Sequence, residues 1–268
     1  MKDKNVLGYT LIRQIEKDGL TETWYAENAN GEKATVISLC HLRLAERFIE
    51  AVWSVQQLTH PNIQRVYGCY ELDGRLCMVT EFLEGEDLNS RMNRGEHFTD
   101  SQLKKWWDQL ASALNYMHGQ GVAHLNIKPS RIFVDSQGDA KLMPDICSTK
   151  IGKPLAMKVG TLIYMSPECV SGSMRSVDGR SDSYTLAVTF VSLMQGRPPY
   201  GPRRTDEYTI SKKIMKTRLP LKGIPVKWKR FLKPYLEKNP DNRPALEPFS
   251  PRKCTMWGWV LGRISWWR

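Results

Sequence analysis

The residues that could take part in chemistry lie close together, between His124 and Asp145. His124, Asn126 and Lys128 fall within a few residues of one another, and Arg131 follows them. An asparagine amide cannot accept a proton at neutral pH, and an arginine side chain stays a cation, so neither suits a general base or a metal ligand. The segment therefore holds the polar residues of a site, although most of them are unsuited to proton transfer or metal binding.

Two short strands are expected to position these residues. The apolar runs Ile132–Val134 and Ala140–Met143 flank a turn at Ser136-Gln137-Gly138, and Pro144-Asp145 follows the second run. This order of loop, strand, turn, strand and loop resembles the catalytic and metal-binding loops of protein kinases. The pattern of that family is H-R-D-x-K-P-x-N, two strands, and D-F-G.

The resemblance gives each position a role. The catalytic loop aligns with residues 124–131, so Asn126 stands where the family has its base and Arg131 where it has one metal ligand. Pro144 stands at the other metal position, and Asp145 could replace it only if the loop register shifts. We therefore expect no functional catalytic residue and no metal site. The degenerate positions are His124, Asn126 and Lys128 for catalysis and Arg131 and Pro144 for metal.

The positions that hold ATP in the family are altered as well. Strands expected at Tyr9–Ile15 and Thr21–Asn28 form the hairpin that carries glycines in kinases, and two carboxylates now stand there, which would repel phosphates. Thr80-Glu81-Phe82-Leu83 resembles the hinge between the lobes. The degenerate ATP positions are Glu16, Asp18, Thr21, Thr35, Ile37, Ala51, Glu81 and Leu83.

The resemblance also implies the loss of an ion pair. Ile37 stands at the phosphate-binding lysine, and Ala51 stands at the helix glutamate that pairs with it. Glu50 is adjacent to Ala51 but about 100° away around the expected helix Leu42–Leu58, so it points elsewhere. Losing both partners together is consistent with a site that no longer needs the pair, since one buried partner alone would be costly.

An active kinase has a column of apolar residues between its lobes. The corresponding residues here are Val55, Val66, His124 and Asp145. A carboxylate at the last position either breaks the column or pairs with His124.

Motifs that stabilise the large lobe of kinases are retained. Gly160–Glu168 matches G-T-x-x-Y-M-x-P-E, residues 182–187 match the start of a buried helix, and residues 239–244 match x-P-x-x-R-P. The resemblance implies that Glu168 and Arg243 form an ion pair and that Asp182 anchors the catalytic-loop backbone. Several motifs are similar to those of bacterial, receptor-associated Ser/Thr kinases.

Composition is that of a soluble globular protein. Of the 268 residues, 41% are hydrophobic and 25% charged, and the net charge is +11. The cysteines at 40, 69, 77, 147, 169 and 254 lack C-x-x-C pairing, which favours reduced thiols in a cytoplasmic protein. No nucleic-acid motif accompanies the basic charge, so we expect no nucleic-acid partner.

The C-terminal residues 250–268 differ from the rest of the chain. They hold Trp257, Trp259, Trp266 and Trp267 together with four arginine or lysine residues. Tryptophan with arginine is typical of a membrane interface, so this tail could contact a membrane surface. A tail packed on the large lobe, or unrelated sequence from a truncated longer chain, is the alternative.

The sequence thus predicts an α+β, two-lobed, protein-kinase-like fold over residues 1–249. A small antiparallel β lobe with one helix is expected at about 8–82, and a larger, mainly helical lobe at about 83–249. The implied function is that of a pseudokinase, which binds, scaffolds or regulates an unknown protein partner without ATP or Mg²⁺. The alternative is a weakly active, ATP-dependent Ser/Thr kinase that uses Asp145 for metal.

Overall fold

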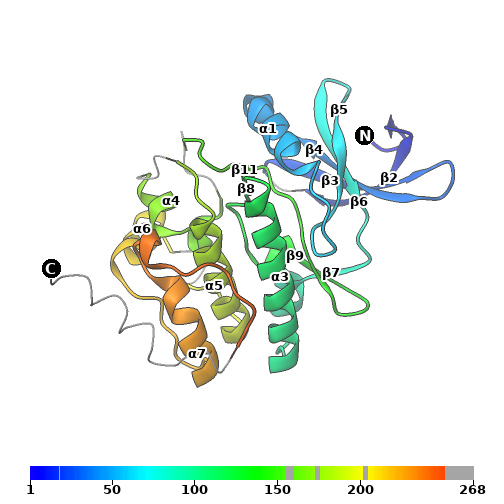
Figure 1. Ribbon diagram of the computed structural model, residues 1–268. Coiled ribbons are helices and arrows are strands. Elements are labelled where there is room, and N and C mark those ends of the chain that lie inside the picture. The colour runs from blue at the N-terminus through cyan, green and yellow to red at the C-terminus, as the bar shows by residue number, and fades with distance from the viewer. Residues whose placement is uncertain (18, 155–159, 173–175, 202–204, 251–268) are drawn as a thin grey trace, which may run out of the picture.

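The computed structural model describes residues 1–17, 19–154, 160–172, 176–201 and 205–250. Asp18 and all but the first residue of the predicted tail lie outside the described residues. The chain folds into two lobes, an antiparallel sheet with one long helix beside it and a larger part that is mainly helical (Figure 1). The predicted α+β fold is confirmed.

The small lobe is built on one sheet, in which the strands follow the order β1-β2-β3-β4-β6-β5. Alternating burial along β3 places Trp24 and Ala26 on the core side, as expected for a half-buried strand. The two-residue β1 is too short to show an alternation pattern in the sequence. The strands are β1 (Asn5–Val6), β2 (Tyr9–Lys17), β3 (Thr21–Asn28), β4 (Lys33–Leu39), β5 (Val66–Leu72) and β6 (Arg75–Glu81).

The helix of the small lobe is shorter than the predicted Leu42–Leu58. A 3-10 turn, η1 (Leu42–Leu44), precedes the α-helix α1 (Ala45–Val55). Phe48, Val52 and Val55 are buried on one face of α1, which is the apolar stripe that packs against the sheet.

The large lobe is organised around two long helices. Thr99 caps α3 through a capping box with Gln102, and α5 is buried along most of its length. Figure 1 shows these two helices side by side in the middle of the lobe. The helices are α2 (Leu88–Asn93), α3 (Asp100–Gly119), α4 (Pro167–Ser171), α5 (Arg180–Gln195), α6 (Glu207–Lys216) and α7 (Val226–Leu232), with 3-10 turns η3 (Leu162–Tyr164), η4 (Lys233–Leu236) and η5 (Pro240–Asn242).

Short strands hold the loops of the site, one just before α2 and the others between α3 and α4. The central strand β9 (Ile132–Asp135) pairs with β10 (Ala140–Leu142) on one side and β7 (Gly85–Asp87) on the other. A second pair joins β8 (Val122–Ala123) to β11 (Thr149–Lys150), and the turn η2 (Pro129–Arg131) leads into β9.

Backbone hydrogen bonds tie the lobes together next to β10. The Gln64 N–H donates to the Leu142 carbonyl over 3.0 Å, and the Leu142 N–H donates to the Asn62 carbonyl over 2.8 Å. The stretch before β5 is therefore fixed to the large lobe. Within the described residues, no helix is both long and apolar enough to cross a membrane.

Candidate functional site

The backbone of the loop after β8 is held by one buried carboxylate. Asp182, at the start of α5, accepts hydrogen bonds from the N–H groups of His124 over 2.9 Å and Leu125 over 2.8 Å. Leu125 has a φ of 61°, a left-handed conformation that is strained for a residue with a branched side chain. His118 also contacts Asp182, 2.9 Å away. Asp182 therefore fixes the conformation in which this loop presents its side chains.

His124 is 1% exposed, and both of its ring nitrogens have partners. The Asn126 backbone N–H lies 3.2 Å from Nδ1, so Nδ1 must accept, and Nε2 donates to the Met143 carbonyl 2.9 Å away. These contacts fix the neutral tautomer with the proton on Nε2. The ring is thus bound to backbone, and Asp145 makes its polar contacts elsewhere.

Asn126 joins three segments of the chain. Its Oδ1 accepts from the Thr161 backbone N–H over 2.8 Å, and its Nδ2 donates to Asp145 Oδ2 over 2.9 Å. The backbone donor requires an oxygen opposite it, so the amide orientation is determined by chemistry. The side chain, 7% exposed, acts as a cross-link between the loop after β8, the loop after β10 and the segment before η3.

Arg131 and Asp145 form an ion pair at the centre of the site. Arg131 Nε lies 2.6 Å from Asp145 Oδ2, and 24% and 1% of the two side chains are exposed. The Nε–H is not aligned with any acceptor among the described residues, so the contact is an ion pair rather than a directed hydrogen bond. The Cys147 backbone N–H supplies another hydrogen bond to Asp145, 3.0 Å long. The carboxylate that could have held a metal is therefore already engaged.

The pKa values agree with this pairing. Burial is the largest influence on the pKa of Asp145 and would raise it, but the charge of Arg131 and the other contacts of the carboxylate, including the hydrogen bond from Cys147, together outweigh burial and lower that pKa to about 2. Burial opposes the charged form of Arg131, yet Asp145 and, more weakly, Glu16 raise its pKa. Both partners are ionised at neutral pH.

Lys128 points toward the same segment as Asn126. Its Nζ lies 2.8 Å from Thr161 Oγ1. Gly160, with a φ of 103°, precedes this threonine, and a β-carbon there would meet the Leu125 carbonyl oxygen at 2.6 Å. Glycine is therefore required for the segment to approach the loop closely enough for both contacts.

Ile37 and Ala51, which align with the lysine and the helix glutamate of the kinase ion pair, are both apolar and buried. Ile37 and Ala51 are 7% and 3% exposed, and Ile37 belongs to the main core together with Phe48 and Val52. Glu50 instead contacts Thr149 over 2.7 Å and Lys153 over 2.8 Å. Lys33 pairs with Glu84 at the outer end of β4.

A cleft of about 490 Å³ lies between the lobes. This volume is in the range of small-molecule sites. Of the predicted ATP positions, Asp18 is outside the described residues. Ala51 is buried within α1, and neither Ala51 nor Glu81 lines the cleft. The predicted positions that line the cleft are Glu16, Thr21, Thr35, Ile37, Leu83, Lys128, Arg131, Pro144 and Asp145.

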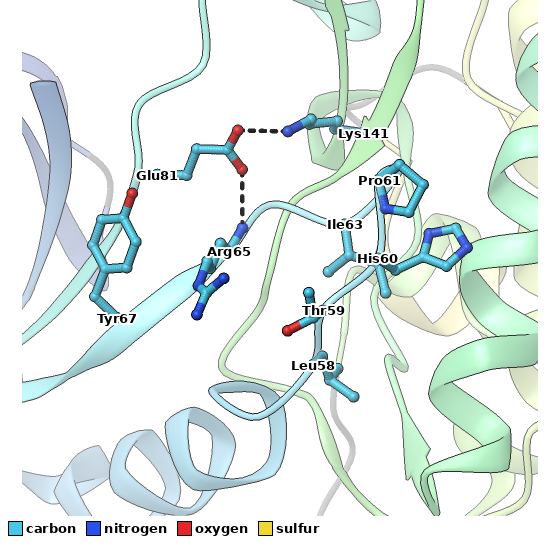
Figure 2. Close-up of a pocket in the computed structure, with 9 residues that line it drawn as sticks. All are labelled: Leu58, Thr59, His60, Pro61, Ile63, Arg65, Tyr67, Glu81 and Lys141. Atoms are coloured by element: carbon cyan, nitrogen blue, oxygen red, sulfur yellow. Dashed lines mark hydrogen bonds and ion pairs between the residues drawn. The ribbon is translucent and has the colours of Figure 1, made fainter.

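Glu81 lines a separate hollow of about 390 Å³ (Figure 2). Its carboxylate pairs with Lys141 and accepts from the Arg65 backbone N–H over 3.2 Å. Ile63 and Arg65 line the same hollow. The Glu81 side chain is therefore fixed outside the cleft.

The residues at the two metal positions do not fit a divalent cation. Pro144 has no side-chain donor, and Arg131 brings a positive charge to the place where the cation would have to bind. Asp145 has its oxygens engaged by Arg131, Asn126 and the Cys147 N–H. Magnesium needs hard oxygen ligands in octahedral geometry, which this set does not offer.

Glu168 and Arg243 make a bidentate ion pair away from the cleft. Arg243 Nη1 and Nη2 lie 2.6 and 2.7 Å from the two Glu168 carboxylate oxygens. Arg243 is 5% exposed and Glu168 is 9% exposed. Burial would raise the pKa of Glu168, but the hydrogen bond and charge of Arg243 lower it. The pair joins α4 to the segment after η5.

Sequence reasoning missed two residues of the site. The Thr161 N–H donates to Asn126 and its hydroxyl accepts from Lys128, whereas the sequence shows Thr161 only as part of a motif. Gln64 lines the cleft between the buried residues Ile63 and Val66. A glutamine shortly before the start of β5 was the available signal, and the I-Q-R-V pattern alone does not show which way its amide points.

Known proteins provide independent information. The family model described as protein kinase domain matches residues 39–252. Over 213 residues the chain is 29% identical to serine/threonine-protein kinase 10 of Mus musculus, which covers 75% of this chain and 22% of that protein. It is 28% identical over 199 residues to CBL-interacting serine/threonine-protein kinase 21 of Arabidopsis thaliana, covering 72% and 46%. With serine/threonine-protein kinase PknJ of Mycobacterium bovis the identity is 27% over 211 residues, covering 72% and 35%. The chain spans less than half the length of each of these curated relatives.

Proposed function

Because this chain belongs to the protein kinase domain family, we propose that it is a pseudokinase, a kinase fold that binds or regulates a partner without transferring phosphate. The observation that carries the proposal is the contact set formed by Asn126, Arg131 and Asp145. These residues do not leave a gap where catalytic groups are missing. They satisfy one another.

Phosphate transfer depends on a base, on bound metal and on charge neutralisation of the phosphates. Asn126 offers an amide that already donates to a carboxylate, and Arg131 occupies the metal region with a fixed positive charge. Ile37 places an apolar side chain where the phosphates would need a cation. Each requirement is therefore unmet for a separate chemical reason.

The alternative, in which Asp145 holds a metal, requires the existing contacts to break. The carboxylate would have to leave Arg131, 2.6 Å away, and the Asn126 amide, 2.9 Å away. Arg131 would then be left in the cleft as an uncompensated charge, which is strongly unfavourable. The geometry therefore favours a site without Mg²⁺ and without ATP.

A domain of this kind acts through its surface. We propose a protein partner, and a cytoplasmic location in which the tail from residue 250 contacts a membrane surface. The tryptophan and arginine content of residues 250–268 supports that contact. Affinity capture with the intact chain, analysed with and without anionic vesicles, tests both parts of this proposal.

The test of inactivity is transfer of radiolabelled γ-phosphate, with Mg²⁺ and separately with Mn²⁺. The native chain should label neither itself nor generic basic substrates above the level of heat-denatured protein. Asn126→Asp, and the pair Ile37→Lys with Asn126→Asp, should stay silent too, because catalytic groups that act as a unit are strongly non-additive.

One result would reverse the proposal. If the native chain transfers phosphate reproducibly and Asp145→Ala abolishes the transfer, Asp145 holds a metal and the chain is an enzyme. Asp241→Ala is the matched control, since Asp241 is an exposed carboxylate remote from the cleft.

A further inference from the structure

The inner wall of the cleft carries a glutamine between two residues that face the opposite way. Ile63 and Arg65 line the outer hollow in Figure 2, whereas Gln64 lines the cleft. Side chains alternate in direction along an extended segment, so this difference follows from the backbone. The Gln64 N–H donates to the Leu142 carbonyl over 3.0 Å, which fixes that backbone to the large lobe.

The amide of Gln64 reaches the hinge. Its Nε2 lies 2.7 Å from the Glu81 carbonyl oxygen and 3.1 Å from Thr80 Oγ1. A carbonyl oxygen requires a donor opposite it, so the nitrogen must face Glu81 and the amide cannot be reversed. The side chain is 2% exposed, and within the described part of the chain its Oε1 has no hydrogen-bond partner.

Other residues of the inner wall are buried as well. Thr35, Ile37 and Met78 line the cleft and are each less than a tenth exposed. Gln64 lines the cleft and Glu81 does not, so the Gln64 amide lies between the Glu81 carbonyl and the space between the lobes. Gln64 supplies that carbonyl with a donor before any ligand arrives.

We propose that Gln64 is the residue that determines which small molecules the cleft admits, because its amide covers the Glu81 carbonyl and so excludes ligands, such as aminopurines, whose exocyclic amine would use that acceptor. The proposal rests on the proposed function, and it adds a second reason why the cleft would not bind ATP, located next to the Glu81 carbonyl. It is separate from the loss of phosphate and metal contacts around Arg131.

The unpaired Oε1 makes Gln64 a suitable residue to replace. A buried acceptor without a donor destabilises a fold, so losing the amide removes an unfavourable group along with the hydrogen bonds of Nε2. The variants Gln64→Ala and Gln64→Val should therefore fold, and their thermal unfolding midpoints should lie close to that of the native chain.

The experiment uses adenosine as the probe, because it has the purine amine and no phosphate. Binding to the native chain and to the variants Gln64→Ala and Gln64→Val is measured by calorimetry without metal. We expect at least about tenfold tighter binding by Gln64→Ala than by the native chain, the factor expected from one hydrogen bond. Met78→Ala is the matched control, because it shortens a side chain of the same wall that covers no carbonyl, and it should show no such gain.

A second probe, N6,N6-dimethyladenosine, cannot donate from its amine. The gain of Gln64→Ala should disappear with this probe. Equal affinity of the native chain and both Gln64 variants for adenosine overturns the proposal, and so does an equal gain with the dimethylated probe. Neither result bears on phosphate transfer, which the γ-phosphate assay measures independently.

Discussion

At the scale of single residues, the site is held together by contacts among its own polar side chains. Arg131 brings a positive charge to the centre of the site, and Asp145 neutralises it from 2.6 Å away. Asn126 then donates to the same carboxylate oxygen. The three side chains are coupled, because each of them provides the charge or hydrogen-bond partner that offsets the cost of burying the others.

Restoring the catalytic base should destabilise the fold. Asn126→Asp places a second carboxylate 2.9 Å from Asp145 and removes the hydrogen bond that Asn126 donates. We expect a loss of about 2 kcal/mol or more in the free energy of unfolding at neutral pH, measured by chemical denaturation.

A double-mutant cycle isolates the cause. In an Asp145→Asn background the same Asn126→Asp change should cost at least about 1 kcal/mol less, because the like charge is gone. Equal costs in both backgrounds would show that repulsion between the carboxylates is not the reason.

The Asp145 ion pair also predicts a pH dependence. Its pKa falls from 3.8 to about 2 in the folded protein, so its stabilisation is complete above pH 4 and is lost as the pH falls toward 2. The difference in unfolding free energy between the native chain and Asp145→Asn should therefore shrink by about 2 kcal/mol from pH 5 to pH 2. A difference that stays constant over this range would contradict an ionised, paired Asp145.

At the scale of elements, buried charged residues hold the loops in place. Asp182 fixes the strained backbone at Leu125, and Glu168 connects α4 to Arg243. Arg243 donates in addition to the carbonyls of Glu237 over 2.8 Å and Arg180 over 3.0 Å. This arrangement makes the large lobe depend on a few ion pairs that lie far from the cleft.

Removing one member of the buried pair should be costly. Glu168→Ala leaves Arg243 buried without its partner, and we expect a loss of about 3–5 kcal/mol in chemical denaturation. Asp241→Ala breaks the exposed pair with Arg180, in which 76% of the aspartate side chain is exposed, and should cost at most about 1 kcal/mol. Similar losses for the two variants would mean that burial does not set the value of the Glu168 pair.

The elements show what a sequence can and cannot predict. The limits of β3, predicted at Thr21–Asn28, follow from alternation and turn residues. The 3-10 turn before α1 and the two-residue β1 are missed, because both are too short to have a periodicity. In the site, the replaced positions are readable from motif spacing, whereas the partners of Asn126 and Gln64 depend on contacts between distant segments.

At the scale of the whole molecule, a cleft lies between the lobes, and two charged side chains that line it, Arg131 and Asp145, form an ion pair with each other. About 490 Å³ remains between the lobes, but the cations that line it beside the degenerate metal positions are paired or held by neighbours. A triphosphate entering the cleft would meet the carboxylate of Glu16, and neither Arg131 nor Pro144 offers a side-chain oxygen ligand that could hold a divalent cation beside it. Space alone therefore does not make this a nucleotide site.

Thermal unfolding gives a direct check of nucleotide binding. Curves recorded with and without millimolar Mg·ATP should superimpose, since binding at a hundred times the dissociation constant would add about 2.7 kcal/mol of stability. Mg²⁺ alone and ATP alone serve as controls, together with an active serine/threonine kinase measured in the same buffer. The prediction would be contradicted if Mg·ATP raised the unfolding midpoint clearly while Mg²⁺ alone and ATP alone did not.

The contacts of Asn126 also bear on how quickly and tightly the domain could be recognised. Three loops that a ligand would otherwise have to order are joined by this one side chain before any encounter. A partner that docks on these loops would lose little conformational entropy, so its affinity would come from contacts rather than be spent on ordering. Association would then resemble rigid-body docking, with an on-rate limited by orientation and not by a slow rearrangement.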